Sequence, residues 1–126
     1  MLKSMLFIFL GGGFGAVVRF LIAKFSIQFF ENNFPVGTLV SNLIACILLG
    51  LLVYQFNFRL DASQRTLYLF LVIGFCGGLS TFSTFSIETF ELLKQGNFTF
   101  AILNVLISVG VGIGALALLF NNNNAQ

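Results

Sequence analysis

The sequence contains no histidine and very few charged residues. Of its 126 residues only six are Lys or Arg and four are Asp or Glu, so charged residues make up 8% of the chain. The absence of His removes the commonest general base. Six basic residues are too few for the clustered cationic face that nucleic-acid binding requires. Nucleic acid is therefore excluded as a partner.

Cysteine is also scarce. Cys46 and Cys76 stand singly inside apolar stretches, without the spacing of metal ligands. Free cysteine behaves as a small buried hydrophobe. Both residues are therefore interpreted as packing residues.

Apolar residues dominate what is present, at 58% of the chain and a mean hydropathy of +1.02. A helix needs about 20 largely apolar residues to cross a hydrocarbon core of roughly 30 Å. Four such segments are predicted, over residues 5–25, 35–56, 67–90 and 98–120, followed by a polar tail over residues 121–126. The sequence thus predicts an all-α integral membrane protein with a single four-helix transmembrane domain.

Short polar connectors separate the four segments. Glu31, Asn32 and Asn33 lie in the first, Arg59, Asp61, Ser63, Gln64 and Arg65 in the second, and Lys94, Gln95, Gly96 and Asn97 in the third. Pro35 suits the first turn of a helix, and Gly96 suits the end of one. Glycines recur at a four-residue spacing typical of close helix packing in lipid. These pairs are Gly11 with Gly15, Gly74 with Gly78, and Gly110 with Gly114.

The basic residues are divided evenly between the two sides of a four-span topology. One side has Lys3, Arg59 and Arg65, and the other has Arg19, Lys24 and Lys94. Cytoplasmic loops normally carry an excess of Lys and Arg, and here that excess vanishes. A chain of this kind inserts in both orientations and pairs as an antiparallel dimer, or else a small bias suffices for one orientation. Charge counting leaves both alternatives open.

The third segment differs from ordinary lipid-facing sequence. Gly77 and Gly78 are followed by six hydroxyl residues between Ser80 and Thr89. This pattern predicts a helix that breaks in mid-membrane and restarts, which is tolerated only where protein, water or ions satisfy the freed backbone groups. The alternative is a continuous helix whose glycines pack against a neighbour and whose hydroxyls bond to their own backbone.

Polar residues form stripes on two other segments. Thr38 with Asn42, and Asn104 with Ser108, each lie at i,i+4 on one helix face. Together with the hydroxyl run they predict a path rich in hydrogen-bond donors and almost free of charge. Phe82 and Phe85, at i,i+3, can turn their electropositive ring edges toward an anion. Such a lining suits a small anion that hydrogen-bonds strongly.

These residues resemble the Fluc family of fluoride channels, also called CrcB-like proteins, along essentially the whole chain. The resemblance rests on three motifs: residues 12–16 followed by Arg19, residues 37–39 followed by Asn42, and above all residues 77–86, Gly-Gly-Leu-Ser-Thr-Phe-Ser-Thr-Phe-Ser. It implies an antiparallel dual-topology homodimer in the cell inner membrane. Such a dimer exports fluoride passively through two pores built from both subunits and has a structural Na⁺ ion at its centre.

The same resemblance assigns roles to individual residues. Phe82 and Phe85 correspond to the pore phenylalanines and Asn42 to the pore amide. The hydroxyls of Ser83, Thr84 and Ser108 join the pore lining, and the two stripes add Thr38 and Asn104 to it. Arg19 is expected near an aqueous vestibule, and the backbone carbonyls of Gly77 and Ser80 are expected to hold the sodium. Family members often carry Thr at the position of Ser80, an exchange to which a carbonyl ligand is indifferent.

Three other classes of protein compete with a channel. A small proton-coupled drug exporter, also four-helical and sometimes dual in topology, needs a membrane carboxylate ordinarily in its first helix, but no acid precedes Glu31. Glu88 is the one acid deep enough to substitute, and its alternative role is a solvated or hydrogen-bonded residue near a helix end. An intramembrane enzyme with a hydroxyl nucleophile lacks a base, so no enzymatic activity is expected. A non-conducting structural subunit explains the glycines but not the polar stripes.

Overall fold

The described part of the chain is helical throughout its long segments. The computed structural model describes residues 1–29, 34–56 and 62–121. The expected connector residues 31–33, 59 and 61, and the tail beyond residue 121, lie outside the described residues. Within those ranges there is no strand, and four helical segments are long and apolar enough to cross a membrane: Leu2–Phe29, Val36–Phe56, Gln64–Lys94 and Phe98–Phe120. The predicted all-α fold with four spans is confirmed.

The first, second and fourth spans are single helices, α1 (Leu2–Phe29), α2 (Val36–Phe56) and α6 (Phe98–Asn121). The third span consists of four consecutive pieces. These are α3 (Ala62–Tyr68), the π-helix η1 (Leu69–Cys76), the short α4 (Gly77–Leu79) and α5 (Phe82–Lys94). Several helices extend beyond the predicted segments: α1 is longer at both ends, α3 begins five residues before 67, and α5 ends four residues after 90.

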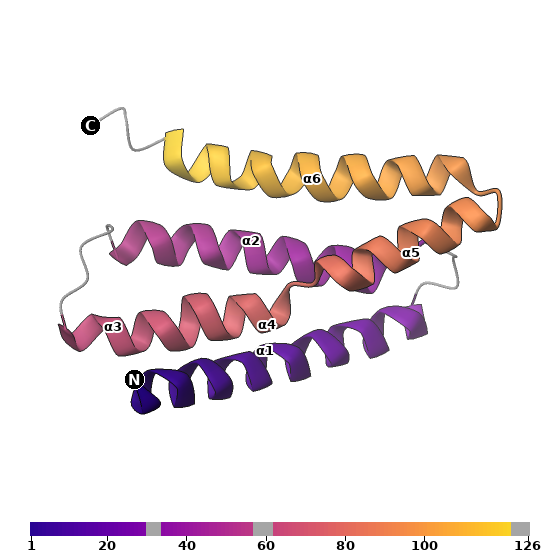
Figure 1. The fold of residues 1–126 in the computed structure, drawn as a ribbon. Coiled ribbons are helices and arrows are strands. Elements are labelled where there is room, and N and C mark those ends of the chain that lie inside the picture. Colours follow the sequence, from indigo (N-terminus) through magenta and orange to yellow (C-terminus); the bar gives the residue numbers. More distant parts are fainter. Residues whose placement is uncertain (30–33, 57–61, 122–126) are drawn as a thin grey trace.

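The four spans lie side by side, and the third one lies beside α1 in its first part and beside α6 in its last part (Figure 1). α1 packs along η1 and α4, α2 contacts both α1 and α6, and α5 leaves the direction of α4 to pack on α6. The start of α1 and the end of α6 lie at the same end of the bundle, as an even number of spans requires. The interruption between α4 and α5 therefore lies where the third span passes from its contact with α1 to its contact with α6.

Glycines make the contact between α1 and the third span. A Cβ on Gly11 would overlap the carbonyl oxygen of Phe70, and a Cβ on Gly78 would overlap that of Gly12. Gly74 is also tightly packed, since its Cβ would stand 2.9 Å from Cα of Gly11. Two of the three predicted glycine pairs thus allow close packing. The third pair does not, because nothing lies within 4 Å of a Cβ on Gly110 or Gly114.

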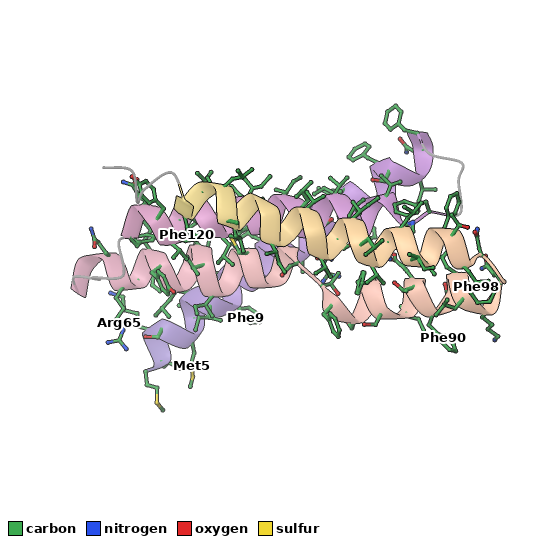
Figure 2. All side chains as sticks on the ribbon, turned by 90° about the horizontal axis from the view of Figure 1, so that it is seen from above. Met5, Phe9, Arg65, Phe90, Phe98 and Phe120 are labelled. Carbon is green, nitrogen blue, oxygen red and sulfur yellow. The ribbon has the colours of Figure 1, made fainter. Side chains whose placement is uncertain are left out.

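The side chains are distributed as expected for a protein in a lipid bilayer. Large apolar side chains cover the outside of the bundle, where Figure 2 shows Met5, Phe9 and Phe90 projecting outward. Polar side chains lie inside instead, since Thr38, Ser41 and Asn104 are buried. A lipid solvent favours this arrangement because buried polar groups must find partners within the protein.

α5 ends at a glycine, as the sequence predicts. Gly96 has a φ of +75°, in the left-handed region. Its N–H donates to the carbonyl of Leu93 (3.0 Å), and the N–H of Asn97 donates to that of Leu92 (2.9 Å). These two bonds satisfy the last carbonyls of α5 and turn the chain directly into α6.

Candidate functional site

The third span is interrupted at Ser80 and Thr81, near the middle of Gln64–Lys94. Ser80 has φ −82° and ψ 155°, and Thr81 has φ −152° and ψ 117°, so both are extended. The helix is therefore interrupted and not continuous, although two parts of the continuous-helix alternative hold. Gly74 and Gly78 pack against α1, and the hydroxyls of Ser80, Ser86 and Thr89 donate to carbonyls of their own helix. The two glycines themselves remain helical: Gly77 has φ −64° and ψ −36°, and Gly78 lies within α4. The break follows the glycines instead of occurring at them.

Asn42, from α2, satisfies the backbone at the break. Its side-chain carbonyl accepts a hydrogen bond from the N–H of Thr81 (2.7 Å), and its amide nitrogen donates to the carbonyl of Thr81 (3.2 Å). The hydroxyl of Thr81 in turn caps α5 by accepting from the N–H of Thr84 (3.3 Å). Asn42 thus replaces, from a neighbouring helix, the bonds that the interrupted helix lacks.

The break releases two backbone carbonyls from their usual donors. In a continuous α-helix the N–H of Thr81 would bond to Gly77 and that of Thr84 to Ser80. Here these N–H groups go to Asn42 and to the hydroxyl of Thr81 instead. The intervening carbonyl of Gly78 accepts from Nε of Arg19 (3.1 Å). The carbonyls of Gly77 and Ser80 therefore suit cation ligation, and both residues line one cavity of about 160 Å³.

A first polar cavity, of about 330 Å³, lies between α1, α2 and α5. It is lined by Ala16, Arg19, Phe20, Ala23, Gly37, Thr38, Ser41, Thr81, Thr84 and Glu88. A smaller cavity of about 130 Å³ shares Ala23, Gly37, Thr38 and Glu88 with it and extends to Pro35, at the beginning of α2. The two cavities adjoin, and together this polar space reaches from the beginning of α2 inward to the break.

Glu88 is part of the wall of this space. Oγ1 of Thr38 donates to Oε1 of Glu88 (2.8 Å), while Oε2 is buried without a hydrogen-bond partner among the described residues. The hydroxyl of Ser41 donates to the carbonyl of Gly37 (2.8 Å). The expected alternative for Glu88, a hydrogen-bonded residue, matches this geometry. Thr38 faces Glu88 and not the phenylalanine pair.

A second cavity, of about 270 Å³, lies on the other side of the break. It is lined by Asn42, Cys46, Ser80, Thr81, Phe82, Phe85, Ser108 and Val109. The ring centroids of Phe82 and Phe85 are 5.9 Å apart with their planes at 37°. Phe82 is 79% exposed in the single chain, whereas Phe85 is half-buried. The structure therefore brings together four predicted pore residues: Asn42, Phe82, Phe85 and Ser108.

The stripe on α6 has a different environment at each of its two residues. Asn104 is buried, and its amide nitrogen donates to Oγ1 of Thr89 (2.9 Å), which donates to the carbonyl of Phe85 (2.7 Å). Oγ of Ser108 lies 3.5 Å from Oδ1 of Asn104. Ser108 lines the second cavity and Asn104 does not. The geometry of Asn104 is that of a residue that fixes α5 on α6.

The hydroxyl residues between Ser80 and Thr89 also differ in their position relative to the two cavities. Thr84 lines the first cavity, and Ser83 is exposed, with Oγ 3.3 Å from the hydroxyl oxygen of Thr81. Thr81 lines both cavities and separates one from the other. It was not among the predicted site residues, although its place in the run made it as visible as its neighbours. Within the described residues, no three His, Cys, Asp or Glu side chains gather as a metal site.

Comparison with known proteins identifies the family. The model of the family described as CrcB-like protein, Camphor Resistance (CrcB), matches residues 6–120. A protein of Citrifermentans bemidjiense named fluoride-specific ion channel FluC is 45% identical over 108 residues, which cover 86% of each chain. Its namesake from Pyrococcus abyssi is 46% identical over 114 residues, or 89% of each chain. The helix break at Ser80 and Thr81 lies within residues 77–86, the main motif of the resemblance. On the match of the family model and the identity to these relatives, this chain belongs to the CrcB-like family.

Proposed function

We propose that this chain is a subunit of a fluoride-selective channel through which fluoride leaves the cell passively. The observation that carries the proposal is the presence of two cavities that share Thr81 as a lining residue, at the interruption of the third span. The names of the relatives agree with it, since they describe fluoride-specific ion channels. A channel function also excludes the intramembrane enzyme considered above.

The lining of the two cavities suits the passage of a small anion. Arg19 supplies a cationic group in the first cavity and attracts an anion into it. Thr81 and Thr84 offer hydroxyl donors further along, and beyond the break the second cavity adds the hydroxyl of Ser108 and the edges of the phenylalanine rings. Beyond Arg19 the anion meets no fixed positive charge among the lining residues, so it is held weakly enough to leave.

Fluoride flux from liposomes tests this function. The purified protein is expected to release fluoride and to retain chloride, each followed with its own electrode on the same liposomes. The reason is that the second cavity is rich in hydrogen-bond donors and has no charged lining residue, which favours the smaller and more strongly hydrogen-bonding ion. Protein-free liposomes give the background. Comparable chloride flux would indicate a generic anion pore, and proton-coupled transport of organic cations would favour an exporter that uses Glu88.

We further propose that the channel is an antiparallel homodimer in the inner membrane, with the break near mid-membrane and two pores built from both subunits. The even division of basic residues supports it. So does the exposure of Phe82 and Gly77 in the single chain, which leaves pore and cation-site groups open to a second subunit.

Labelling from the two faces of the membrane tests the dual topology. In a variant with Cys46 and Cys76 replaced by Ser, Ser63→Cys is expected to react with an impermeant maleimide from either face, in two separate populations. Intact cells report the outer face and inverted inner-membrane vesicles the other. Modification from a single face would leave one orientation and exclude the antiparallel pair.

We propose that the carbonyls of Gly77 and Ser80 bind the sodium ion at the centre of the dimer. The break supports this assignment because it diverts the N–H groups that would otherwise occupy both carbonyls. Carbonyl oxygens without a carboxylate suit a hard, monovalent cation.

Replacement of one side chain tests the carbonyl assignment. The hydroxyl of Ser80 donates to the carbonyl of Cys76 (3.0 Å), within its own helix. Ser80→Ala is therefore expected to keep the sodium dependence of the dimer's thermal unfolding, measured in sodium against choline. A variant that assembles but no longer responds to sodium would make the hydroxyl the ligand.

A further inference from the structure

Both cysteines of the chain line one cavity. Cys46 on α2 and Cys76 at the end of η1 bound a space of about 160 Å³, whose other walls are Ala45, Leu49, Val72, Gly77 and Ser80. Neither cysteine forms a disulfide; Cys76 is buried and Cys46 is half-buried. The sequence shows them only as separate apolar residues thirty positions apart. Their approach to a common cavity is a product of the fold.

The rest of this cavity offers few competing ligands. Its other side chains are apolar except for the hydroxyl of Ser80, which is bonded to the carbonyl of Cys76. No carboxylate lines it, and the chain has no histidine. A hard cation would prefer the carbonyl oxygens of Gly77 and Ser80, whereas a soft cation prefers the two sulfur atoms. The two kinds of ion would thus use different atoms.

We propose that Cys46 and Cys76 form a two-thiolate binding site for a soft divalent cation, with Hg²⁺ as the probe. When the ion binds, each thiol releases its proton to water and each sulfur forms one bond to the metal. Two thiolates balance the charge of a divalent ion, so the complex is neutral. A neutral complex is favoured in an apolar cavity, where an unbalanced charge would be costly.

The position of Cys46 implies that its side chain must rotate when the ion binds, and that this rotation affects a second cavity. Sγ of Cys46 lies 3.4 Å from the position that a Cβ on Gly112 would take, so it is on the α6 side of α2. Binding requires a rotation of this side chain to another staggered position, toward η1. Cys46 also lines the cavity that contains Phe82 and Phe85. Occupation of the thiolate site therefore alters a wall of the proposed fluoride path.

Direct binding tests the site without any assumption about function. Purified protein in a chloride-free nitrate buffer is titrated with Hg²⁺, and the bound metal is counted by native mass spectrometry. One ion per chain is expected, with affinity lowered about 100-fold or more in both Cys46→Ser and Cys76→Ser, because each variant leaves a single thiolate. Met5→Leu, which removes an exposed sulfur on α1, is the matched control and should bind as the parent does.

Stoichiometry separates a shared site from two independent thiols. Two ions per parent chain and one per single variant, at unchanged affinity, would overturn the proposal. The absence of binding to a folded parent protein would overturn it equally. Cys76→Ala serves as a second variant if Cys76→Ser does not fold, since it removes the same sulfur without burying a hydroxyl.

The effect on flux rests on the proposed channel function. Hg²⁺ is expected to lower fluoride flux through the parent protein about tenfold or more, with recovery after a dithiol removes the metal. Cys76→Ser should conduct and resist Hg²⁺. Equal inhibition of the parent and Cys76→Ser would overturn the link between this site and the path. The absence of flux before any metal is added would contradict the channel function and leave the binding result intact.

Discussion

Replacement of Gly11 by Ala is expected to leave little correctly folded protein, because α1 can then no longer pack on the third span. A Cβ at this position overlaps the carbonyl oxygen of Phe70 and stands 3.0 Å from the backbone nitrogen of Phe75. Both are backbone atoms, which cannot rotate away as a side chain would. Overpacking costs typically about 1–3 kcal/mol, and a clash with backbone is expected at the upper end of that range.

A neighbouring glycine provides the control. Gly13 lies on the same helix, but nothing stands within 4 Å of a Cβ built on it. Gly13→Ala is expected to fold as well as the parent or slightly better, since Ala favours helix over Gly by roughly 1 kcal/mol. The yield of monodisperse protein in detergent and its unfolding temperature measure both variants. If Gly11→Ala matched Gly13→Ala, the close packing of α1 on η1 would be wrong.

The number of spans could be predicted from the sequence, but the ends of the helices could not. Four apolar runs of about 20 residues permit hardly any other arrangement in lipid. Hydropathy, however, reports the thickness of the hydrocarbon and not the extent of backbone hydrogen bonding. Helix α1 therefore continues beyond the predicted ends, and the added first turn includes Lys3. The π-helix η1 leaves no signal in residue periodicity that would distinguish it from an α-helix.

The position of the break depends on a residue in another helix. The sequence pattern associated the break with Gly77 and Gly78, whereas Gly78 serves close packing against Gly12 and the chain opens at Ser80 and Thr81. Thr81 can open there because both of its backbone groups bond to Asn42. A tertiary partner of this kind is invisible to local pattern reasoning.

The polar stripes can be predicted from the sequence, but the residues that their side chains contact cannot. Thr38 and Asn42 share a helix face, but four residues separate them by about 6 Å along the axis. That distance places Thr38 beside Glu88 in the first cavity and Asn42 at the break. The sequence leaves Glu88 as either an exporter's carboxylate or a hydrogen-bonded residue near a helix end, and the structure adds that it forms part of the wall of the polar space. Residue spacing predicts which face a side chain shares, but not which neighbour it meets.

Replacement of Phe82 or Phe85 by Ile is expected to lower fluoride flux at least about tenfold, equivalent to about 1.4 kcal/mol in the barrier. Ile keeps hydrophobic bulk but removes the electropositive ring edge that would contact an anion. Both rings line the second cavity, and Phe82 makes little packing contact within its own chain, since it is 79% exposed. Removal of the Phe82 ring should therefore affect conduction more than folding.

Phe90 offers a matched control for this experiment. It lies on the same helix, is 58% exposed and lines neither cavity. Phe90→Ile should conduct as the parent does, because an exchange of one apolar residue for another costs little where no ion passes. All three variants are compared after flux is divided by the amount of assembled dimer. Near-normal flux through both Phe82→Ile and Phe85→Ile would show that these rings serve packing, and the ion would then depend on the hydroxyls of Thr81 and Ser108 for its contacts.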